Sequence, residues 1–344
     1  MKLSRLLAPA LVAAMLVPAS AEEKKIPVEI ETVVTGLTNP SGIAVQPGDE
    51  NQTRLFISDS GALRVVSVDA KNPSELKEVI TGFPKDVYGK GPAYDIGPLG
   101  LAFINKNTLV VGGGGLPDGE ELVRVYALPE DGKTLQASEM KVQLGPIGPG
   151  EQTAKGEGNF YAIAVADNAL YVTCNGDDTK GWVAKADLAG DTPSNFQPFI
   201  ATKEATEVDA PTGIAINRKG HIVVGQLGEI TVPNDSLLTF YSPKTGKMLM
   251  NLETGLFDIV ALAYSPSGRL YALDFAWMDT KQGGLYRLDD DGNDGVTAVK
   301  VAELDKPTAM AFAPDGTLYV TVFGAADDGS TKESGKVLKI TGKL

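Results

Sequence analysis

The hydrophobic positions of this chain fall into short runs that are separated by turn residues. One phrase recurs: a small or turn residue, an apolar-Ala-apolar segment, a turn, and then a second apolar segment. Residues 211–216 (Pro-Thr-Gly-Ile-Ala-Ile), followed by residues 221–224 (His-Ile-Val-Val), form one copy. Apolar runs of four to eight residues between turns are typical of β-strands, so each copy predicts a pair of strands.

The phrase occurs six times, and each copy is followed by a third strand-like run. In five copies a fourth run can also be found. The central apolar residues of the copies are Ile43, Leu101, Ile163, Ile214, Leu262 and Met310. Their spacings of 58, 62, 51, 48 and 48 residues give a period near 50. About four short strands in such a period predict an all-β fold, a six-bladed β-propeller with four antiparallel strands in each blade.

The sixth copy has no fourth strand of its own, because only four residues follow Ile340. A spare apolar run lies at the other end of the chain, at residues 28–34. Pairing it beside residues 337–340 completes the last blade and closes the ring, which removes two exposed sheet edges. We therefore expect one domain over residues 28–344.

The first residues are predicted to be an export signal. Lys2 and Arg5 precede an apolar stretch that is too short to span a membrane, and Ala19-Ser20-Ala21 is a small-x-small cleavage site. The sequence thus predicts a signal peptide at 1–21, a linker at 22–27, and a protein exported to the periplasm or the extracellular space.

The amino-acid composition limits the partners and the kinds of catalytic or metal site that the protein can have. The 31 basic and 44 acidic residues give a net charge of −13, which makes nucleic acid an unlikely partner for a chain without a basic run. One Cys, Cys174, and one His, His221, exclude an intramolecular disulfide and every site that needs two imidazoles. We expect no membrane span and a monomer.

Two phrases carry a resemblance to known proteins. Residues 36–45 read Gly-Leu-x-x-Pro-x-Gly-Ile-Ala-Val, and residues 313–320 read Ala-Pro-Asp-Gly-x-Leu-Tyr-Val. They resemble the NHL-repeat and SMP-30/gluconolactonase-like six-bladed propellers, and they are similar to the exported propellers of the scytonemin cluster. The resemblance implies the fold over nearly the whole mature chain. It does not choose among the lactonases, esterases, lyases, binding modules and scaffolds that share this fold.

The lactonases of this group imply a calcium or zinc site built from carboxylate and amide oxygens on the propeller axis. In that family an Asn or Asp directly precedes the Gly-apolar start of an inner strand. The residues here are Ser41, Leu99, Tyr161, Thr212, Val260 and Thr308, none of which is a carboxylate or an amide. A rebuilt site would have to use other acids, for which the candidate metal ligands are Asp59, Glu157 and Asp274.

The longer loops are predicted to lie on one face. In a propeller, the connections from second to third strands share a face with those from fourth strands to the next first strands, and binding usually resides in long loops on a rigid scaffold. Asp59 and Asp274 occupy the same repeat position, at the end of a second strand, where they either bind a ligand or hold their loops. The candidate ligand-binding residues on this face are Asp59, Tyr94, Asp95, Asn159, Tyr161, Asn175, Asp258, Asp274 and Trp277.

Two hypotheses for function follow. The first is an exported binding or scaffold module that uses the long-loop face for a protein, a peptide or a small molecule, and that needs no cofactor. The alternative is a lactonase- or esterase-type hydrolase with a non-standard axial site that holds Ca²⁺ or Zn²⁺.

Overall fold

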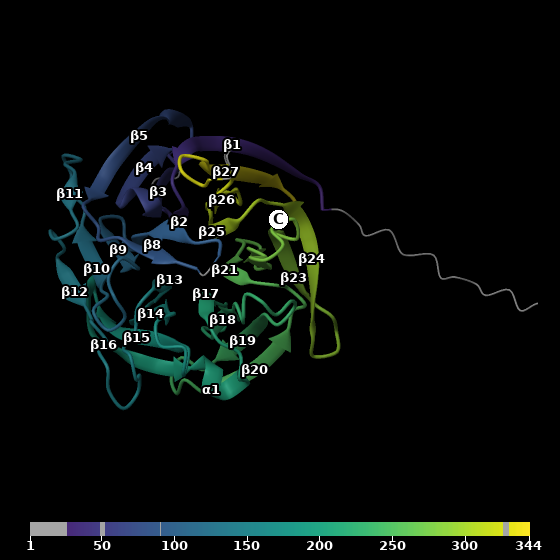
Figure 1. Ribbon diagram of the computed structural model, residues 1–344. Coiled ribbons are helices and arrows are strands. Elements are labelled where there is room, and N and C mark those ends of the chain that lie inside the picture. Colours follow the sequence, from purple (N-terminus) through teal and green to yellow (C-terminus); the bar gives the residue numbers. More distant parts are fainter. Residues whose placement is uncertain (1–25, 49–51, 90, 326–329) are drawn as a thin grey trace, which may run out of the picture.

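The computed structural model describes residues 26–48, 52–89, 91–325 and 330–344, and in these residues six antiparallel sheets surround a central axis (Figure 1). The predicted signal peptide and all but two residues of the predicted linker lie outside the described residues. Each sheet is one blade, and its first strand faces the axis. The all-β, six-bladed propeller predicted from the repeats is confirmed.

The six blades follow the chain in order. Blade 1 holds β2 (Pro40–Val45), β3 (Arg54–Asp59), β4 (Arg64–Asp69) and β5 (Asn72–Thr81). Blade 2 holds β8 (Pro98–Asn105), β9 (Thr108–Gly113), β10 (Val123–Ala127) and β12 (Val142–Leu144). Blade 3 holds β13 (Phe160–Ala166), β14 (Ala169–Cys174), β15 (Trp182–Ala189) and β16 (Thr192–Ala201). Blade 4 holds β17 (Pro211–Ile216), β18 (Ile222–Gln226), β19 (Leu237–Tyr241) and β20 (Met248–Glu253). Blade 5 holds β21 (Ile259–Tyr264), β22 (Leu270–Asp274), β23 (Gly284–Asp290) and β24 (Val296–Glu303).

Blade 6 is made from both ends of the chain. Its inner three strands are β25 (Pro307–Phe312), β26 (Leu318–Val322) and β27 (Gly335–Gly342), and its outer strand is β1 (Val28–Leu37). β1 pairs antiparallel with β27, in a register that sets Ile30 opposite Ile340. The predicted closure of the ring by the N-terminal strand is therefore present, and the observed strand runs three residues further than residues 28–34.

Small residues at the start of each inner strand let the blades approach one another. A Cβ built on Gly42 would lie 2.1 Å from the carbonyl oxygen of Leu99 in the next blade, and one on Gly100 would lie 2.4 Å from that of Tyr161. The same repeat position holds Gly213 in blade 4 and alanine in the remaining three blades. The Gly or Ala that marks each repeat in the sequence thus reflects backbone contact between neighbouring blades.

The hydrophobic core is divided among the contacts between blades. Most buried apolar residues of the described chain form six clusters, one at each contact between adjacent blades. The cluster between blades 5 and 6 also takes in Tyr94 and, from blade 4, Ala210 and Leu227. The cluster between blades 6 and 1 contains Val33, Val34 and Leu37 from β1, packed with Ile57 and Val337. No blade covers its own two faces, so each depends on both of its neighbours.

A hairpin, a short strand, a short helix and a 3₁₀ turn were not predicted. The long loop before blade 2 contains a hairpin of β6 (Asp86–Tyr88) and β7 (Tyr94–Ile96). A short strand, β11 (Leu135–Gln136), leaves blade 2 and pairs in parallel with β5 of blade 1. A five-residue helix, α1 (Thr202–Thr206), and a single 3₁₀ turn at Ser60–Ala62 complete the structure.

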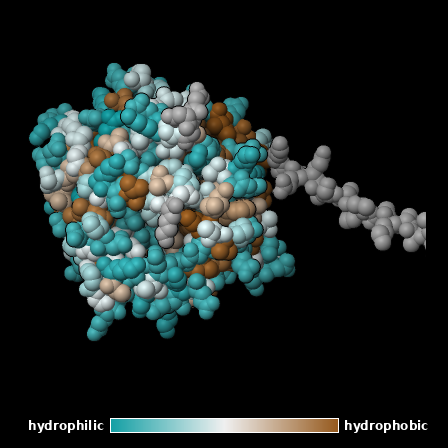
Figure 2. All heavy atoms as spheres, in the orientation of Figure 1, coloured by the Kyte–Doolittle hydropathy of each residue, from teal (hydrophilic) through white to brown (hydrophobic). Residues whose placement is uncertain are grey.

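The surface drawn in Figure 2 is mostly hydrophilic, and its hydrophobic side chains form small, separated patches. Within the described residues, no helix has the length and apolar composition needed to cross a bilayer.

The closure of the ring generates the first prediction. Leu37 is fully buried in the cluster between blades 6 and 1, so Leu37→Ala should lower the free energy of unfolding by about 2–5 kcal/mol. Leu76, which is 37% exposed on β5, serves as the matched control, and Leu76→Ala should cost less than about 1 kcal/mol. Urea unfolding of the two variants measures the difference. Equal losses would contradict the role given to β1.

Candidate functional site

The central channel is lined by the second residue of each inner strand, and one of these residues crosses it. Tyr161 of blade 3 reaches blade 6, where its hydroxyl donates to the carbonyl oxygen of Thr308 at 3.1 Å. It lines both an upper cavity of about 60 Å³, towards the long loops, and a lower cavity of about 110 Å³. Burial raises the pKa of the Tyr161 hydroxyl, which therefore stays neutral and able to donate. Tyr161 thus separates the two ends of the channel.

Threonine hydroxyls near the channel axis join neighbouring blades. The Thr212 hydroxyl donates to the carbonyl oxygen of Ile259, and the Thr308 hydroxyl donates to that of Pro40. Thr173, on the second strand of blade 3, donates to the carbonyl oxygen of Thr212 at 2.9 Å. These hydroxyls satisfy backbone acceptors at the axis, so they hold the ring together.

The β6–β7 hairpin covers the mouth of the channel with aromatic rings. The Tyr88 ring lies 5.8 Å from the Trp277 ring, edge to face. Tyr94 makes the same kind of contact with Trp277 at 5.3 Å and with Phe323 at 5.0 Å. Phe275 packs against Trp277, with ring centroids 4.9 Å apart. Such pairs add to the hydrophobic energy of burial, so the hairpin is fixed to the loops of blades 5 and 6.

The upper cavity lies beneath this aromatic cover. Asn159 donates to the carbonyl oxygen of Asn175 at 3.2 Å, and the Asn175 amide donates to the Tyr88 hydroxyl at 2.9 Å. The wall is otherwise almost wholly apolar, with Leu99 and Val260 among its side chains. The indole N–H of Trp277 is buried and has no hydrogen-bond partner. Trp277 lines this apolar cavity, so a residue of its wall carries an unused donor.

Asp59 and Asp274, at the ends of second strands, hold the loops that lead into their blades. Asp274 is fully buried and accepts hydrogen bonds from the backbone N–H groups of Phe257, Asp258 and Ala276 at 2.8–3.1 Å. Asp59 accepts from the N–H of Thr38 at 2.6 Å and from the Arg64 guanidinium at 2.9 Å. Burial raises the pKa of both carboxyl groups, and these donors offset part of the rise.

In other blades, different residues hold the loops at this repeat position. Gln226 occupies the position of Asp59 in blade 4, and its amide donates to the carbonyl oxygen of Val208 at 2.6 Å. In blade 2 the position is Gly113, where a Cβ would lie 2.1 Å from the carboxylate of Glu121. Glu121 fills that space and accepts from the N–H groups of Leu116 and Leu122. The shared repeat position of Asp59 and Asp274 therefore marks a loop anchor.

Two further buried carboxyl groups have raised pKa values. Burial raises the pKa of Asp258 to about 7, partly offset by a hydrogen bond from the backbone N–H of Trp277. Burial also raises the pKa of Glu157 to about 7, and the nearby Asp177 adds to the rise. Thr153 and the Gly176 backbone lower it slightly, although neither forms a hydrogen bond of normal geometry with the carboxyl group. Both acids are protonated for much of their population near neutral pH.

The candidate metal ligands do not converge. Within the described ranges, no three His, Cys, Asp or Glu side chains are grouped so that they could hold a metal ion. Asp59 and Asp274 are occupied by backbone donors in different blades, and Glu157 belongs to the loop before blade 3. Ca²⁺ needs six to eight converging oxygens and Zn²⁺ usually four ligands, so this donor set does not fit either ion.

Five of the residues proposed from the sequence come together around the upper cavity: Tyr94, Asn159, Tyr161, Asn175 and Trp277. Asp258 lies behind it, bonded to the backbone of Trp277. Asp95 lies at the rim, where its carboxylate pairs with Lys85 at 2.6 Å. Sequence reasoning missed Tyr88, Phe275 and Phe323. The two tyrosines on either side of a Gly-Lys-Gly-Pro turn, Tyr88 and Tyr94, are the signal that would have indicated a hairpin.

Glu157 generates a pH prediction. Below the usual glutamate pKa of 4.5, both the folded and the unfolded chain hold this proton. As the pH rises to about 7 the unfolded chain ionises first, so stability falls across this window and then levels off. Glu157→Gln should remove the part of that fall that Glu157 causes, while the part caused by Asp258 remains, and it should be more stable than the parent above pH 7, by roughly 1–3 kcal/mol. Urea unfolding at several pH values tests this, with the exposed Glu151→Gln as control. A parental slope in Glu157→Gln would refute it.

Comparison with known proteins places the fold. No family model and no curated protein matches the sequence. Among solved structures, a gluconolactonase from Xanthomonas campestris is similar at 15% identity and a TM-score of 0.59, over 93% of this chain and 91% of that one. A glucose dehydrogenase is similar at 16% identity and a TM-score of 0.60, over 92% of this chain and 100% of that one.

A luciferin-regenerating enzyme is similar at 13% identity and a TM-score of 0.59, over 92% of this chain and 96% of the other. At such identities the likeness shows the fold and leaves the reaction open. The chain has the six-bladed propeller fold that its repeats predicted, and the gluconolactonase structure shares this fold, as the resemblance of residues 36–45 and 313–320 implied.

Proposed function

We propose that this protein is a binding module whose ligand site is the covered mouth of the channel on the long-loop face. The observation that carries the proposal is the upper cavity, which is apolar, is covered by the β6–β7 hairpin, and is lined by Trp277, whose buried indole N–H has no hydrogen-bond partner. A buried donor without an acceptor is costly, and a ligand acceptor would remove that cost.

The cavity defines the ligand chemistry. Its volume of about 60 Å³ compares with roughly 30 Å³ for a water molecule in the liquid, so only a very small ligand fits while the hairpin is closed. A larger one requires the hairpin to move away from the Trp277 ring. The ligand is therefore small and mostly apolar, with one oxygen or nitrogen that accepts from Trp277.

Export is part of the proposal. The signal peptide predicted at residues 1–21 would deliver the protein to the periplasm or the extracellular space. A binding module in either compartment meets small molecules from outside the cell as well as cell-envelope components.

A lactonase- or esterase-type hydrolase is the second candidate, and the fold of the gluconolactonase structures supports it. Asp258 and Glu157, whose pKa values are raised to about 7 by burial, are the acids that such an activity would draw on. Both are closed off from solvent, and the donor set does not fit Ca²⁺ or Zn²⁺. Release of acid from gluconolactone, unchanged in the presence of EDTA, would favour the hydrolase and displace the binding proposal.

The binding proposal predicts a thermal shift with small aromatic probes. Benzene and phenol are both too large for the closed cavity of about 60 Å³, so each enters only when the β6–β7 hairpin moves away from the Trp277 ring. Phenol should then raise the melting temperature more than benzene does, because its oxygen can accept from the Trp277 N–H. Val260→Phe, which fills the cavity, should abolish both shifts. Ile30→Phe makes a similar change at a side chain that is 45% exposed on β1, and it should leave both shifts intact. Differential scanning fluorimetry at matched probe concentrations measures the shifts of the parent and the two variants with each probe.

Trp277→Phe separates packing from hydrogen bonding, since it keeps an aromatic ring and removes the donor. It should retain the benzene shift and lose the extra shift with phenol. Equal shifts for the two probes in the parent protein, or full shifts in Val260→Phe, would show that the probes bind elsewhere.

A further inference from the structure

The negative charge of the protein is concentrated on one face. The described loops of the long-loop face are residues 38–39, 60–63, 82–89, 91–97, 114–122, 145–159, 175–181, 202–210, 227–236, 254–258, 275–283, 304–306, 323–325 and 330–334. Their described residues include 18 Asp and Glu against 7 Lys and Arg, a formal net charge of −11 in which the partly protonated Glu157 and Asp258 are counted as ionised. All other described residues include 20 acidic and 19 basic, a net charge of −1. Strands and the opposite face are therefore almost neutral.

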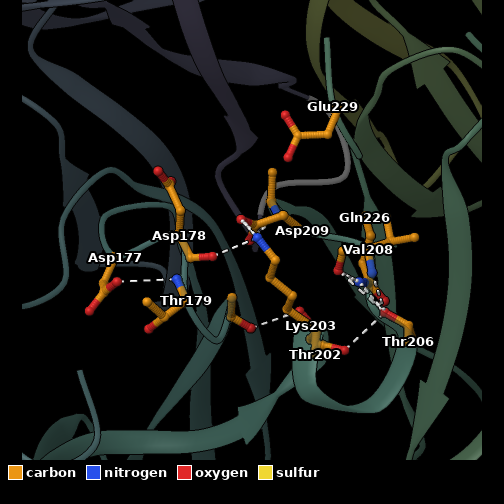
Figure 3. Close-up of polar contacts among 12 residues, drawn as sticks. Asp177, Asp178, Thr179, Thr202, Lys203, Thr206, Val208, Asp209, Gln226 and Glu229 are labelled. Atoms are coloured by element: carbon orange, nitrogen blue, oxygen red, sulfur yellow. Dashed lines mark hydrogen bonds and ion pairs between the residues drawn. The ribbon is translucent and has the colours of Figure 1, made fainter. Parts of the chain in front are cut away.

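Several of these carboxylates gather where the loops of blades 3 and 4 meet. Figure 3 shows Lys203 directed towards Asp178 and Asp209, with Glu229 on the next loop. The nearby Lys180 is paired with Glu204 at 2.8 Å. Lys203 donates to the Asp209 carboxylate and to the backbone oxygen of Asp178, both at 2.7 Å. One cation among three acids leaves an excess of negative charge at this point, and the side chains of Asp178 and Glu229 are exposed.

The same excess extends to the hairpin over the channel. Burial raises the pKa of the Tyr88 hydroxyl, and the charges of Asp178, Asp209 and Asp258 add to the rise. Burial likewise raises the pKa of Asp118, with further contributions from Asp178 and Asp86. The carboxylates of several loops are thus close enough to repel one another around the hairpin.

Exposed apolar side chains lie among the acidic residues of this face. Val87 on the hairpin is 51% exposed and Met278 in the loop of blade 5 is 63% exposed. They adjoin Tyr88 and Trp277 in the chain, whose rings are in contact, so the two lie on loops that meet over the channel. Val232 is 47% exposed and lies in the same loop as Glu229, on the same face. Apolar side chains within a charged rim are the composition of a protein-binding surface.

We propose that the long-loop face is a docking surface for a cationic protein segment, one in which lysine or arginine alternates with apolar side chains. Its cations neutralise the repelling carboxylates, and its apolar side chains cover Val87, Met278 and Val232. The charge is spread over loops of several blades, which suits an extended polypeptide better than a small ion. The proposal goes beyond the small-ligand site, because it uses the rim and leaves the cavity closed.

Fluorescence anisotropy with labelled peptides tests the proposal on the mature protein. The probes are a ten-residue peptide of alternating Lys and Leu, its counterpart with Glu in place of Lys, and an oligolysine of equal length. The Lys-Leu peptide should bind most tightly, and its affinity should fall as salt screens the charges. The Glu-Leu peptide should not bind. Oligolysine should bind more weakly than the Lys-Leu peptide, because it cannot cover the apolar side chains.

Two triple variants with the same change in net charge locate the surface. The first triple, Asp86→Asn, Asp178→Asn and Glu229→Gln, neutralises exposed acids of the long-loop face. It should lower the affinity for the Lys-Leu peptide by roughly five- to tenfold. The second triple, Glu29→Gln, Glu130→Gln and Asp167→Asn, neutralises exposed acids elsewhere on the protein. It should lower the affinity for the same peptide by less than about twofold. Equal losses in the two triples, or equal affinity for the Glu-Leu peptide, would overturn the proposal while leaving the small-ligand site untouched.

Discussion

Every blade of this protein needs a neighbour on both faces. Most buried apolar residues lie in six clusters at the contacts between adjacent blades, so no blade has a core that is complete by itself. The ring must therefore close for any part of it to be stable, and closure depends on β1 pairing with β27 across the full length of the sequence. Thr212, Thr308 and Tyr161 add hydrogen bonds between blades at the axis. The rigidity of the long-loop face follows from this closure, because each of its loops joins strands of a closed ring.

The acidic residues of that face divide into two groups with different roles. Asp59, Asp274 and Glu121 are buried, and their oxygens accept hydrogen bonds from backbone N–H groups of the loops they hold. Asp86, Asp178 and Glu229 are exposed and have an excess of like charge around them. The first group fixes the shape of the face and the second gives it a negative potential. The net charge of the chain is explained by this one surface, since the remaining described residues are nearly neutral.

The sequence predicted the fold more fully than the site. Repeats such as residues 211–216 and 307–312 impose strands, and the missing fourth strand of the last repeat required residues 28–34 to close the ring. The β6–β7 hairpin was not predicted, because its strands are only three residues long and are stabilised by the distant rings of Trp277 and Phe323. The pairing of β11 with blade 1 depends on contacts between blades that no local pattern records. The sequence offered Trp277 as a candidate ligand-binding residue of the long loops, and the structure shows it 7% exposed beneath the hairpin. Its burial follows from tertiary packing with Tyr88 and Tyr94, which the spacing of residues cannot show.

The central claim is that the long-loop face, and not the opposite face or an outer strand, is where this protein binds. Hydrogen–deuterium exchange of the native protein with and without the Lys-Leu peptide tests it without any substitution. The account predicts slower exchange in the hairpin at 86–96 and in the loops at 175–181, 227–236 and 275–283, with no change in the turns of the opposite face. Protection confined to those opposite turns, or to the exposed outer strand β20, would contradict it.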